Sequence, residues 1–369
     1  MPKVLFVAAH RPDRSPSQRF RFEQYLDFLR QNGFECDFSW LVSPEDDSFL
    51  YKHGNYFRKF SFLQKSYRIR KKDVKIADTY DIIFVQREAL MFRSTRFERA
   101  FSQKSKLVFD FDDAIWLMDV SEGNRNWRWL KDPSKTSHII EMSHMIFAGN
   151  RYLAEYARQF NSNVKIIPTT IDTDYHKKKK SAASKNKICI GWAGSTTTIK
   201  HFRMAENFLV RLKEKYGDKI YFKLIGDASY ESPQLGLKGT AWNLKTEIED
   251  LSEFDIGIMP LPDDEWAKGK CGFKGLQYMA MEIPAIMSPV GVNTDIVEDG
   301  VNGFLATTDD EWIEKISLLI DSEELRRKFG AEGRRTVVEK YSVESQKERY
   351  LEFFNELISS KSQVVSHKS

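Results

Sequence analysis

Short apolar runs alternate with helix-forming segments along the chain, and this rhythm constrains the fold more than any other feature. In the first half the apolar runs are residues 4–9, 82–85, 106–109 and 145–148. In the second half they are residues 188–192, 220–225 and 254–259. Strands that alternate with helices form a parallel sheet that is covered on both faces. The sequence therefore predicts an α/β fold with two doubly wound, Rossmann-like domains.

A charged, serine-rich stretch, KKKKSAASKNK, separates the two halves. Such a stretch holds too few apolar residues to join a core, which is typical of a linker. We expect an amino-terminal domain over residues 1–176, a linker over 177–187, a second domain over 188–342, and a helix with a frayed polar tail over 343–369. Ligands of doubly wound sheets bind beyond the carboxyl ends of the strands, so we expect the domains to face each other across a ligand-binding cleft.

Composition excludes several classes of protein. The 369 residues carry a net charge of +4, which is too weakly basic for a dedicated nucleic-acid binder. The three cysteines are scattered, and neither they nor the histidines have metal-ligand spacing, so we expect a reducing compartment and neither a metal nor a cofactor. The first residues do not form a signal peptide, and no apolar run is long enough to span a bilayer. We expect a cytoplasmic protein.

Two glycine-containing turns in the second half have the composition of anion sites. One turn contains Gly272, carries Lys270 and Lys274, and leads into a run of helix formers. The other, Gly194 to Thr198, follows an apolar run and precedes Lys200. Backbone N–H groups at a helix start attract phosphate, and lysines add positive charge. The competing interpretations are solvated lysines on an ordinary turn and a Ser or Thr that caps a helix.

The order of residues after the Gly272 turn resembles that of a known family. The matching residues are Met279-Ala280, Pro284, Gly291, Ile296-Val297, Asp299-Gly300 and Asn302-Gly303. On these residues the segment from Ile188 to Tyr341 resembles the donor-binding domain of glycosyltransferase family 4, a family of retaining enzymes with the GT-B fold. The resemblance implies a GT-B fold and metal-independent transfer of a sugar from a nucleotide-diphosphate donor.

The resemblance also implies which residues contact the donor. These are Gly194, Ser195, Lys200, Gly272, Lys274 and Gln277. The family usually places two glutamates eight residues apart in this region, but Gly269 and Gln277 occupy those positions here. The amide of Gln277 can still form hydrogen bonds with ribose hydroxyls. We hypothesise that Lys270 and Lys274 replace the lost contacts with charge directed at the diphosphate.

Three aspartates, Asp110, Asp112 and Asp113, follow an apolar run in the first half. Family members often carry a catalytic His-Asp at this strand end, so the resemblance implies that Asp112 and Asp113 are catalytic. Two other interpretations are a metal-binding Asp-x-Asp of the GT-A type and a phosphatase of the haloacid-dehalogenase type. In the latter, Asp110 would be the nucleophile and Asp112 the acid/base. One of the aspartates could instead cap a helix.

Three arginines follow strand ends in the first half: Arg19, Arg21 and Arg87. The resemblance places an acceptor-side loop there, so these arginines are candidates for binding an anionic acceptor; a solvated helix start is the alternative. Residues 52–75 combine basic and aromatic side chains. This segment is either a peripheral contact with the inner face of an anionic membrane or a helix whose aromatic side chains pack inward.

The sequence thus predicts a glycosyltransferase that moves a sugar to a glycan or lipid-linked acceptor in cell-surface polysaccharide synthesis. The phosphatase based on Asp110 and Asp112 remains one alternative. A non-catalytic protein that binds a nucleotide sugar or a glycan is the other, because the glutamate pair is missing.

Overall fold

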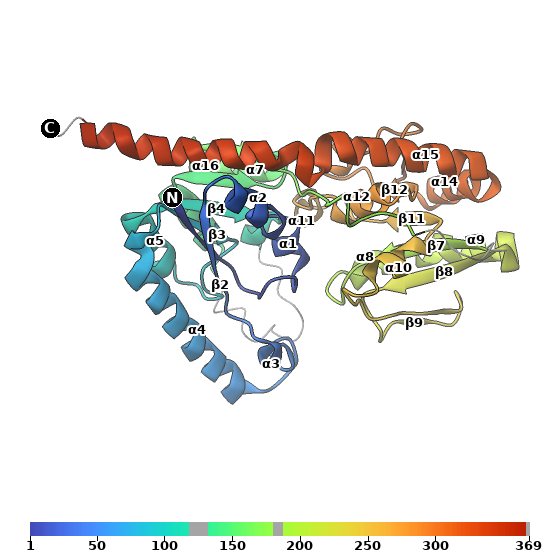
Figure 1. The fold of residues 1–369 in the computed structure, drawn as a ribbon. Helices are drawn as coiled ribbons and strands as arrows, with labels where there is room; N and C mark the ends of the chain where they lie inside the picture. The colour runs from blue at the N-terminus through green and yellow to red at the C-terminus, as the bar shows by residue number, and fades with distance from the viewer. Residues whose placement is uncertain (118–131, 180–186, 367–369) are drawn as a thin grey trace. The chain divides into compact units, whose positions relative to one another are not determined.

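The computed structural model describes residues 1–117, 132–179 and 187–366, with side chains described as far as residue 359. Contacts between residues divide the chain into two compact units. Unit 1 comprises Met1–Thr169 with Gln346–Ser369, and unit 2 comprises Thr170–Ser345. Each unit contains a parallel sheet with helices (Figure 1). The predicted pair of doubly wound α/β domains is therefore confirmed.

Unit 1 is built on a six-stranded parallel sheet in the order β2-β1-β3-β4-β5-β6. Its strands are β1 Lys3–Val7, β2 Glu35–Ser39, β3 Ile82–Gln86, β4 Lys106–Phe111, β5 Met145–Ala148 and β6 Val164–Ile166. Strands β3 and β5 are buried along their whole length, as continuous apolar runs in a covered parallel sheet should be.

The α-helices of unit 1 connect these strands. They are α1 Pro16–Arg19, α2 Leu26–Gln31, α3 Pro44–Asp47, α4 Tyr56–Ile76, α5 Arg96–Lys104, α6 Ser134–Met142 and α7 Arg151–Arg158. In Figure 1, α4 forms an edge of unit 1 and α3 lies near its first turns. The ion pair between Lys65 of α4 and Asp46 of α3 joins these two helices.

The final helix, α16 (Val343–Ser366), contributes to the core of unit 1. The ring of Tyr350 stacks on Tyr25 with centroids 4.1 Å apart, and Phe354 is also fully buried. Burying an aromatic side chain of this size contributes about 1.5–3 kcal/mol. The segment predicted as a separate helix and tail is thus, from Gln346 onward, a structural part of unit 1.

Unit 2 contains a five-stranded parallel sheet in the order β13-β12-β11-β7-β8. Its strands are β7 Ile188–Ala193, β8 Ile220–Ile225, β11 Ile256–Met259, β12 Ala285–Met287 and β13 Phe304–Leu305. A small antiparallel pair, β9 Glu231–Ser232 and β10 Leu237–Lys238, lies outside this sheet.

The α-helices of unit 2 connect its strands, and several of them contribute to one hydrophobic core. They are α8 Ile199–Arg203, α9 Glu206–Tyr216, α10 Glu247–Ser252, α11 Glu265–Lys268, α12 Phe273–Ala280, α13 Asn293–Ile296, α14 Asp309–Asp321 and α15 Glu323–Thr336. Phe208 of α9 stacks on Trp312 of α14 with centroids 5.0 Å apart, and Trp192 of β7 lies in the same core.

The boundary between the units lies at Thr169–Thr170, upstream of the stretch predicted as a linker. The described part of that stretch is attached to unit 2: the Lys178 ammonium donates to the carbonyl oxygen of Phe254 at 3.3 Å, and the Lys179 amide donates to Ser252 Oγ at 3.1 Å. Backbone and side-chain hydrogen bonds can thus fix a segment that has too few apolar residues to join a core. The remainder, residues 180–186, lies outside the described residues.

Three further features concern membrane-spanning helices, metal-binding side chains and cysteine thiols. None of their helices is both long and apolar enough to cross a membrane. Among residues 1–117, 132–179 and 187–366, no group of three or more His, Cys, Asp or Glu side chains is arranged to hold a metal ion. The three cysteines are buried thiols.

Candidate active site

The turn after β7 presents hydroxyl groups at the carboxyl edge of the unit 2 sheet. The Ser195 amide donates to Thr198 Oγ1 at 2.9 Å, and the Thr198 amide donates back to the Ser195 carbonyl oxygen at 2.9 Å. Gly194 is required by packing, because a Cβ added there would lie 2.1 Å from the ring of Trp192. Helix α8, which follows, has only five residues. The turn therefore offers hydroxyls and the side chain of Lys200 rather than the dipole of a long helix.

The second turn precedes α12 and depends on Gly272. This residue has a φ of +67°, and a Cβ added there would meet Ile296 Cδ1 at 2.3 Å. Both the left-handed backbone and the close approach therefore favour glycine. Gly272 is the N-cap of α12, which places Lys274 in the first turn of this helix. Positive charge on that side chain lies at the helix end that attracts anions.

The two turns come together around Trp192 and His201. The Lys274 ammonium lies 5.5 Å from the centroid of the Trp192 ring, which is a cation–π contact. Burial, together with the charges of Lys274, Lys270 and Lys200, lowers the pKa of His201 to about 4. An effect of three lysines on one imidazole requires them to be near it. The structure thus brings both predicted turns into one cationic cluster, which we define as Lys200, Lys270 and Lys274.

Sequence analysis did not single out Trp192 or His201 as parts of this site. Only 1% of Trp192 is exposed, and it falls within an apolar run that predicts core alone. The buried Trp192 Nε1 and His201 Nδ1 have no hydrogen-bond partner among the described residues. Unpartnered buried polar atoms cost stability, so each one in a native protein calls for an explanation, and a functional role is one such explanation.

Gln277 lies in a buried polar network of unit 2. Its Nε2 is 3.2 Å from Glu247 Oε1 and 3.2 Å from His176 Nε2. The same Glu247 oxygen accepts a hydrogen bond of 3.1 Å from Trp242 Nε1. A buried carboxylate needs such donors. Glu247 therefore supplies, from α10, a carboxylate next to position 277, where this chain has an amide.

The predicted catalytic carboxylates of unit 1 are held by an arginine. Arg87 Nε donates to Asp112 Oδ1 at 2.7 Å, and its Nη2 donates to Asp113. Burial opposes the charge of Arg87, but the two carboxylates outweigh it and raise the pKa of Arg87. Arg87 has a φ of +61°, a conformation that costs a non-glycine residue about 1–3 kcal/mol and occurs mostly at functional sites. Arg87, predicted on the acceptor side, thus belongs with Asp112 and Asp113.

Asp110 and Arg21 form a fully buried ion pair. The Arg21 guanidinium donates to both carboxylate oxygens of Asp110 and to the carbonyl oxygen of Ile167. Asp110 has no exposed surface, so it is not placed to attack a substrate as the phosphatase alternative requires. Arg21 is likewise inaccessible to an acceptor and has a structural role. Arg19 is only half-buried, with its guanidinium carbon 4.9 Å from the centroid of the Phe20 ring.

Helix α4 reverses the usual burial of charged and aromatic side chains. Phe57 is 93% exposed and Phe60 is 59% exposed, whereas Arg70 is buried. The Arg70 guanidinium donates to Asp73 Oδ2 at 2.8 Å and to the carbonyl oxygen of Ala8 at 2.6 Å. The inward packing of aromatics offered as an alternative is thus wrong for these two phenylalanines. The exposed charges of α4 are all positive: Arg58, Arg68, Lys71, Lys72 and Lys75.

Part of this site lies in a segment that is similar to a known family. Residues 266–336, which include the Gly272 turn and α12, match the model of the family "Glycosyl transferases group 1". Over 87 residues the chain is 36% identical to the poly(ribitol-phosphate) alpha-N-acetylglucosaminyltransferase of Staphylococcus aureus (strain COL). That match covers 23% of this chain and only 18% of the relative.

Two solved structures resemble almost the whole chain. Sucrose-phosphate synthase from Thermosynechococcus elongatus has a TM-score of 0.67 at 12% identity, covering 98% of this chain and 100% of that one. HepE from Anabaena, solved in complex with UDP and glucose, has a TM-score of 0.64 at 15% identity, covering 96% and 100%. At such identities the likeness shows the fold alone. The chain therefore has the GT-B fold, and its segment over residues 266–336 is similar to group 1 glycosyltransferases.

Proposed function

We propose that this protein is a glycosyltransferase of family 4. It moves a sugar, with retention of configuration, from a nucleotide-diphosphate sugar to a glycan or lipid-linked acceptor in the synthesis of cell-surface polysaccharide. The observation that carries the proposal is the cationic cluster around His201, part of which lies in the segment that matches group 1 glycosyltransferases.

The cationic cluster would hold the diphosphate of the donor. Three ammonium groups neutralise the charge that develops on the leaving diphosphate, which is the role that a metal ion plays in other transferases. Because the ammonium groups would take the place of the metal ion, we propose a metal-independent reaction. UDP-sugars are the first donors to test, because HepE was solved with UDP and glucose.

The neighbouring polar groups would orient the donor. Gly194 and Ser195 contribute backbone and hydroxyl contacts to the diphosphate, and Gly272 permits close approach of the backbone. Gln277 and its partner Glu247 would receive the ribose hydroxyls. Retention would follow from attack on the same face as the leaving group, assisted by the leaving phosphate, which needs no carboxylate nucleophile.

The carboxylates of unit 1 would act on the acceptor. Asp112 and Asp113 orient its hydroxyl group, and Arg87 fixes the two carboxylates. Because both carboxylates share one guanidinium, a change at Arg87 would displace them together. We therefore assign Arg87 a positioning role.

The exposed face of α4 supports a contact with the inner surface of a membrane. Phe57 and Phe60 are large apolar groups in solvent, and the exposed charges around them are positive. Aromatic side chains insert at the level of lipid headgroups, and each basic residue near an anionic surface adds about 1 kcal/mol. Such a contact would bring the enzyme to a lipid-linked acceptor.

The proposal is tested by incubating the protein with a panel of UDP-, GDP- and ADP-sugars, with and without magnesium. Donor binding, released nucleotide diphosphate and released phosphate are measured separately. A glycosyltransferase binds one donor and releases its nucleotide diphosphate slowly in water and faster with acceptor extracts, regardless of magnesium. Donor binding without any turnover would indicate a binding protein, and magnesium-dependent phosphate release from an aryl phosphate would indicate a phosphatase.

A further inference from the structure

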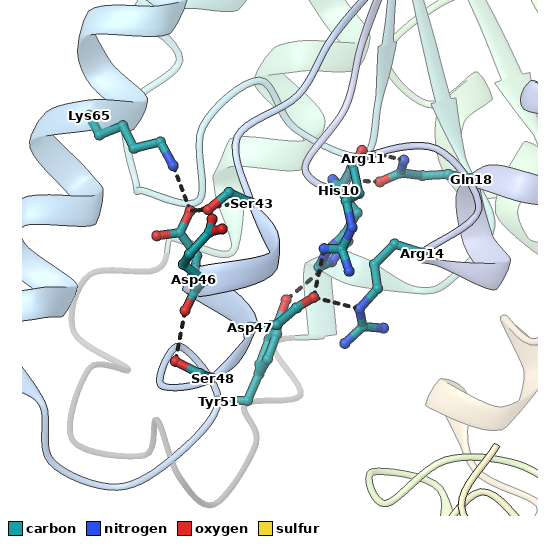
Figure 2. A network of polar contacts seen from close by, with 11 residues as sticks. His10, Arg11, Arg14, Gln18, Ser43, Asp46, Asp47, Ser48, Tyr51 and Lys65 are labelled. Carbon is teal, nitrogen blue, oxygen red and sulfur yellow. Dashed lines mark hydrogen bonds and ion pairs between the residues drawn. The ribbon is translucent and has the colours of Figure 1, made fainter. Parts of the chain in front are cut away.

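The loop that follows β1 carries two arginines bound to one carboxylate oxygen (Figure 2). Arg11 Nη1 lies 2.6 Å and Arg14 Nε lies 2.9 Å from Asp47 Oδ2. Burial raises the pKa of Asp47, but the hydrogen bonds and charges of Arg14 and Arg11 outweigh it and lower the pKa. The carboxylate is therefore ionised at neutral pH. Two positive charges face one negative charge, and this group of three has a net charge of +1.

The two guanidinium groups keep donors beyond those that Asp47 uses. Each uses one nitrogen on Asp47, and within the described residues no further side-chain hydrogen bond is recorded for Arg11 or Arg14. Their side chains are 29% and 37% exposed, so the remaining N–H groups can be reached from solvent. Paired guanidinium groups match the oxygen geometry of a phosphate.

The backbone of this loop is fixed by Gln18. The His10 amide donates to Gln18 Oε1 at 2.8 Å, and Gln18 Nε2 donates to the His10 carbonyl oxygen at 2.8 Å. Tyr51 Oη lies 3.1 Å from His10 Nε2 (Figure 2). The loop is thus attached to Gln18 and Tyr51 at His10, just before the arginine pair, and to Asp47 through both arginines. Arginines held in this way lose little conformational entropy when they bind a ligand.

The loop lies close to the predicted acceptor machinery of unit 1. Strand β1 pairs directly with β3, and the residue after β3 is Arg87. Burial, together with the charges of Arg14, Arg87 and Arg11, lowers the pKa of His10 to about 4 although Asp47 opposes this, so Arg87 is near the imidazole. A ligand bound to the arginine pair would therefore lie near Asp112 and Asp113, which Arg87 holds.

We propose that Arg11 and Arg14 form a subsite for a phosphate group on the acceptor. This inference rests on the proposed transferase function and adds the chemical class of acceptor: one that carries a phosphate ester near the hydroxyl that is glycosylated. Asp47 keeps the two guanidinium groups side by side in the empty site, where their charges would otherwise repel. His10 is neutral; its Nε2 contacts Tyr51, and its buried Nδ1 has no hydrogen-bond partner among the described residues.

A purely structural role for the arginines is the competing explanation. One ion pair to Asp47 would suffice to attach the loop to α3. The second arginine brings an additional charge close to the first, and half-exposed ion pairs contribute only about 0–1 kcal/mol. The Oδ1 atom of Asp47 is buried without a hydrogen-bond partner among the described residues, so both arginines bind only the Oδ2 atom of this carboxylate. An anion between the guanidinium groups explains the second arginine.

The test measures binding of sn-glycerol 3-phosphate to the full chain by ³¹P NMR line broadening, with the donor site saturated by UDP. The wild type should bind, and Arg11→Gln and Arg14→Gln should each weaken binding about tenfold or more, since each removes charge-assisted hydrogen bonds. Arg30→Gln is the matched control, because Arg30 is an exposed arginine of unit 1 that pairs with Asp27, and it should change nothing. Glycerophosphoglycerol, a phosphodiester, is titrated in parallel to distinguish a polymer or headgroup diester from a free monoester.

Absence of binding in the presence of UDP, or equal binding by wild type and Arg14→Gln, would overturn the proposal. Arg14→Lys separates a binding defect from a folding defect. It keeps the positive charge beside Asp47 but lacks the planar guanidinium group. This variant should bind sn-glycerol 3-phosphate several-fold more weakly while its circular dichroism spectrum stays unchanged. A wild type that binds sn-glycerol 3-phosphate but no nucleotide sugar would contradict the proposed transferase while leaving the arginine subsite in place. The two failures are therefore distinguishable.

Discussion

The ammonium group of Lys274 lies 5.5 Å from the centroid of the Trp192 indole ring. Lys274 lies in the first turn of α12 and Trp192 lies near the end of β7, so this contact joins the two turns predicted to bind the donor diphosphate. Trp192 also lies against Gly194, where a Cβ would overlap its ring. One buried ring thus sets the position of both turns.

Replacing Gly194 should weaken donor binding. Gly194→Ala introduces a methyl group 2.1 Å from the Trp192 ring, so either the ring or the turn must move. We expect a loss of about 1–3 kcal/mol in stability and at least tenfold weaker nucleotide-sugar binding, measured by calorimetry. Gly236→Ala is the control: it strains a left-handed residue in open space and should lower stability without changing donor affinity.

Breaking the buried ion pair should destabilise unit 1. Asp110→Leu leaves the Arg21 guanidinium buried without its counter-charge, which costs about 3–5 kcal/mol. The double variant Arg21→Met/Asp110→Leu should recover much of the loss in thermal unfolding midpoint. If Asp110→Asn instead abolished phosphate release or sugar transfer while stability stayed at the wild-type value, Asp110 would be a catalytic residue and not a structural one.

Acidification should destabilise unit 2 through His201. The pKa of His201 is about 4 in the folded protein, against an ordinary value of 6.5. As the pH falls, the imidazole is therefore protonated in the unfolded chain before it is protonated in the folded protein. The stability that the neutral imidazole contributes is complete above pH 6.5 and is lost as the pH falls from 6.5 toward 4. By pH 5 the loss is about 2 kcal/mol. Thermal unfolding of His201→Gln at pH 7.5 and pH 5 should show a smaller difference than the wild type, and an equal difference would contradict this assignment.

The aromatic face of α4 should carry membrane binding. Phe57→Ser/Phe60→Ser should abolish flotation with vesicles that contain phosphatidylglycerol, and Arg68→Gln/Lys71→Gln/Lys72→Gln should reduce it most at low salt. Arg70 must be kept, because it is buried against Asp73. Leu318→Ser removes an exposed leucine of unit 2 and should have no effect. Wild-type protein that stays at the bottom of the gradient would refute the membrane contact.

The fold could be predicted because period and length of apolar runs are local properties. Ile82 to Val85 is apolar without interruption, which a covered parallel strand requires, and it is β3 in the structure. The turns at Gly194 and Gly272 were recognisable for the same reason, since each joins a strand or turn to a helix. Their convergence on one imidazole depends on packing between distant segments, which no local pattern contains.

Burial of charge explains most of what could not be predicted. Arg21 follows the same turn as Arg19 and has the same side chain as a surface arginine, yet Asp110, far away in sequence, neutralises it in the core. In α4 the positions of Lys59 and Arg70 face inward because carbonyl oxygens and Asp73 satisfy them. Propensity alone assigns these residues to solvent, which favoured the alternative in which the aromatic side chains pack inward.

The double variant Lys200→Ala/Lys274→Ala tests the central claim most directly. Both lysines act on His201 across the two turns, so their removal should weaken binding of the preferred nucleotide sugar at least a hundredfold, as measured by isothermal titration calorimetry. Lys238→Ala removes an exposed lysine of unit 2 that pairs with Glu231 and should leave binding unchanged. If the double variant bound the donor as tightly as the wild type, the cationic cluster would not be the diphosphate site and the account of this protein as a nucleotide-sugar transferase would lose its main support.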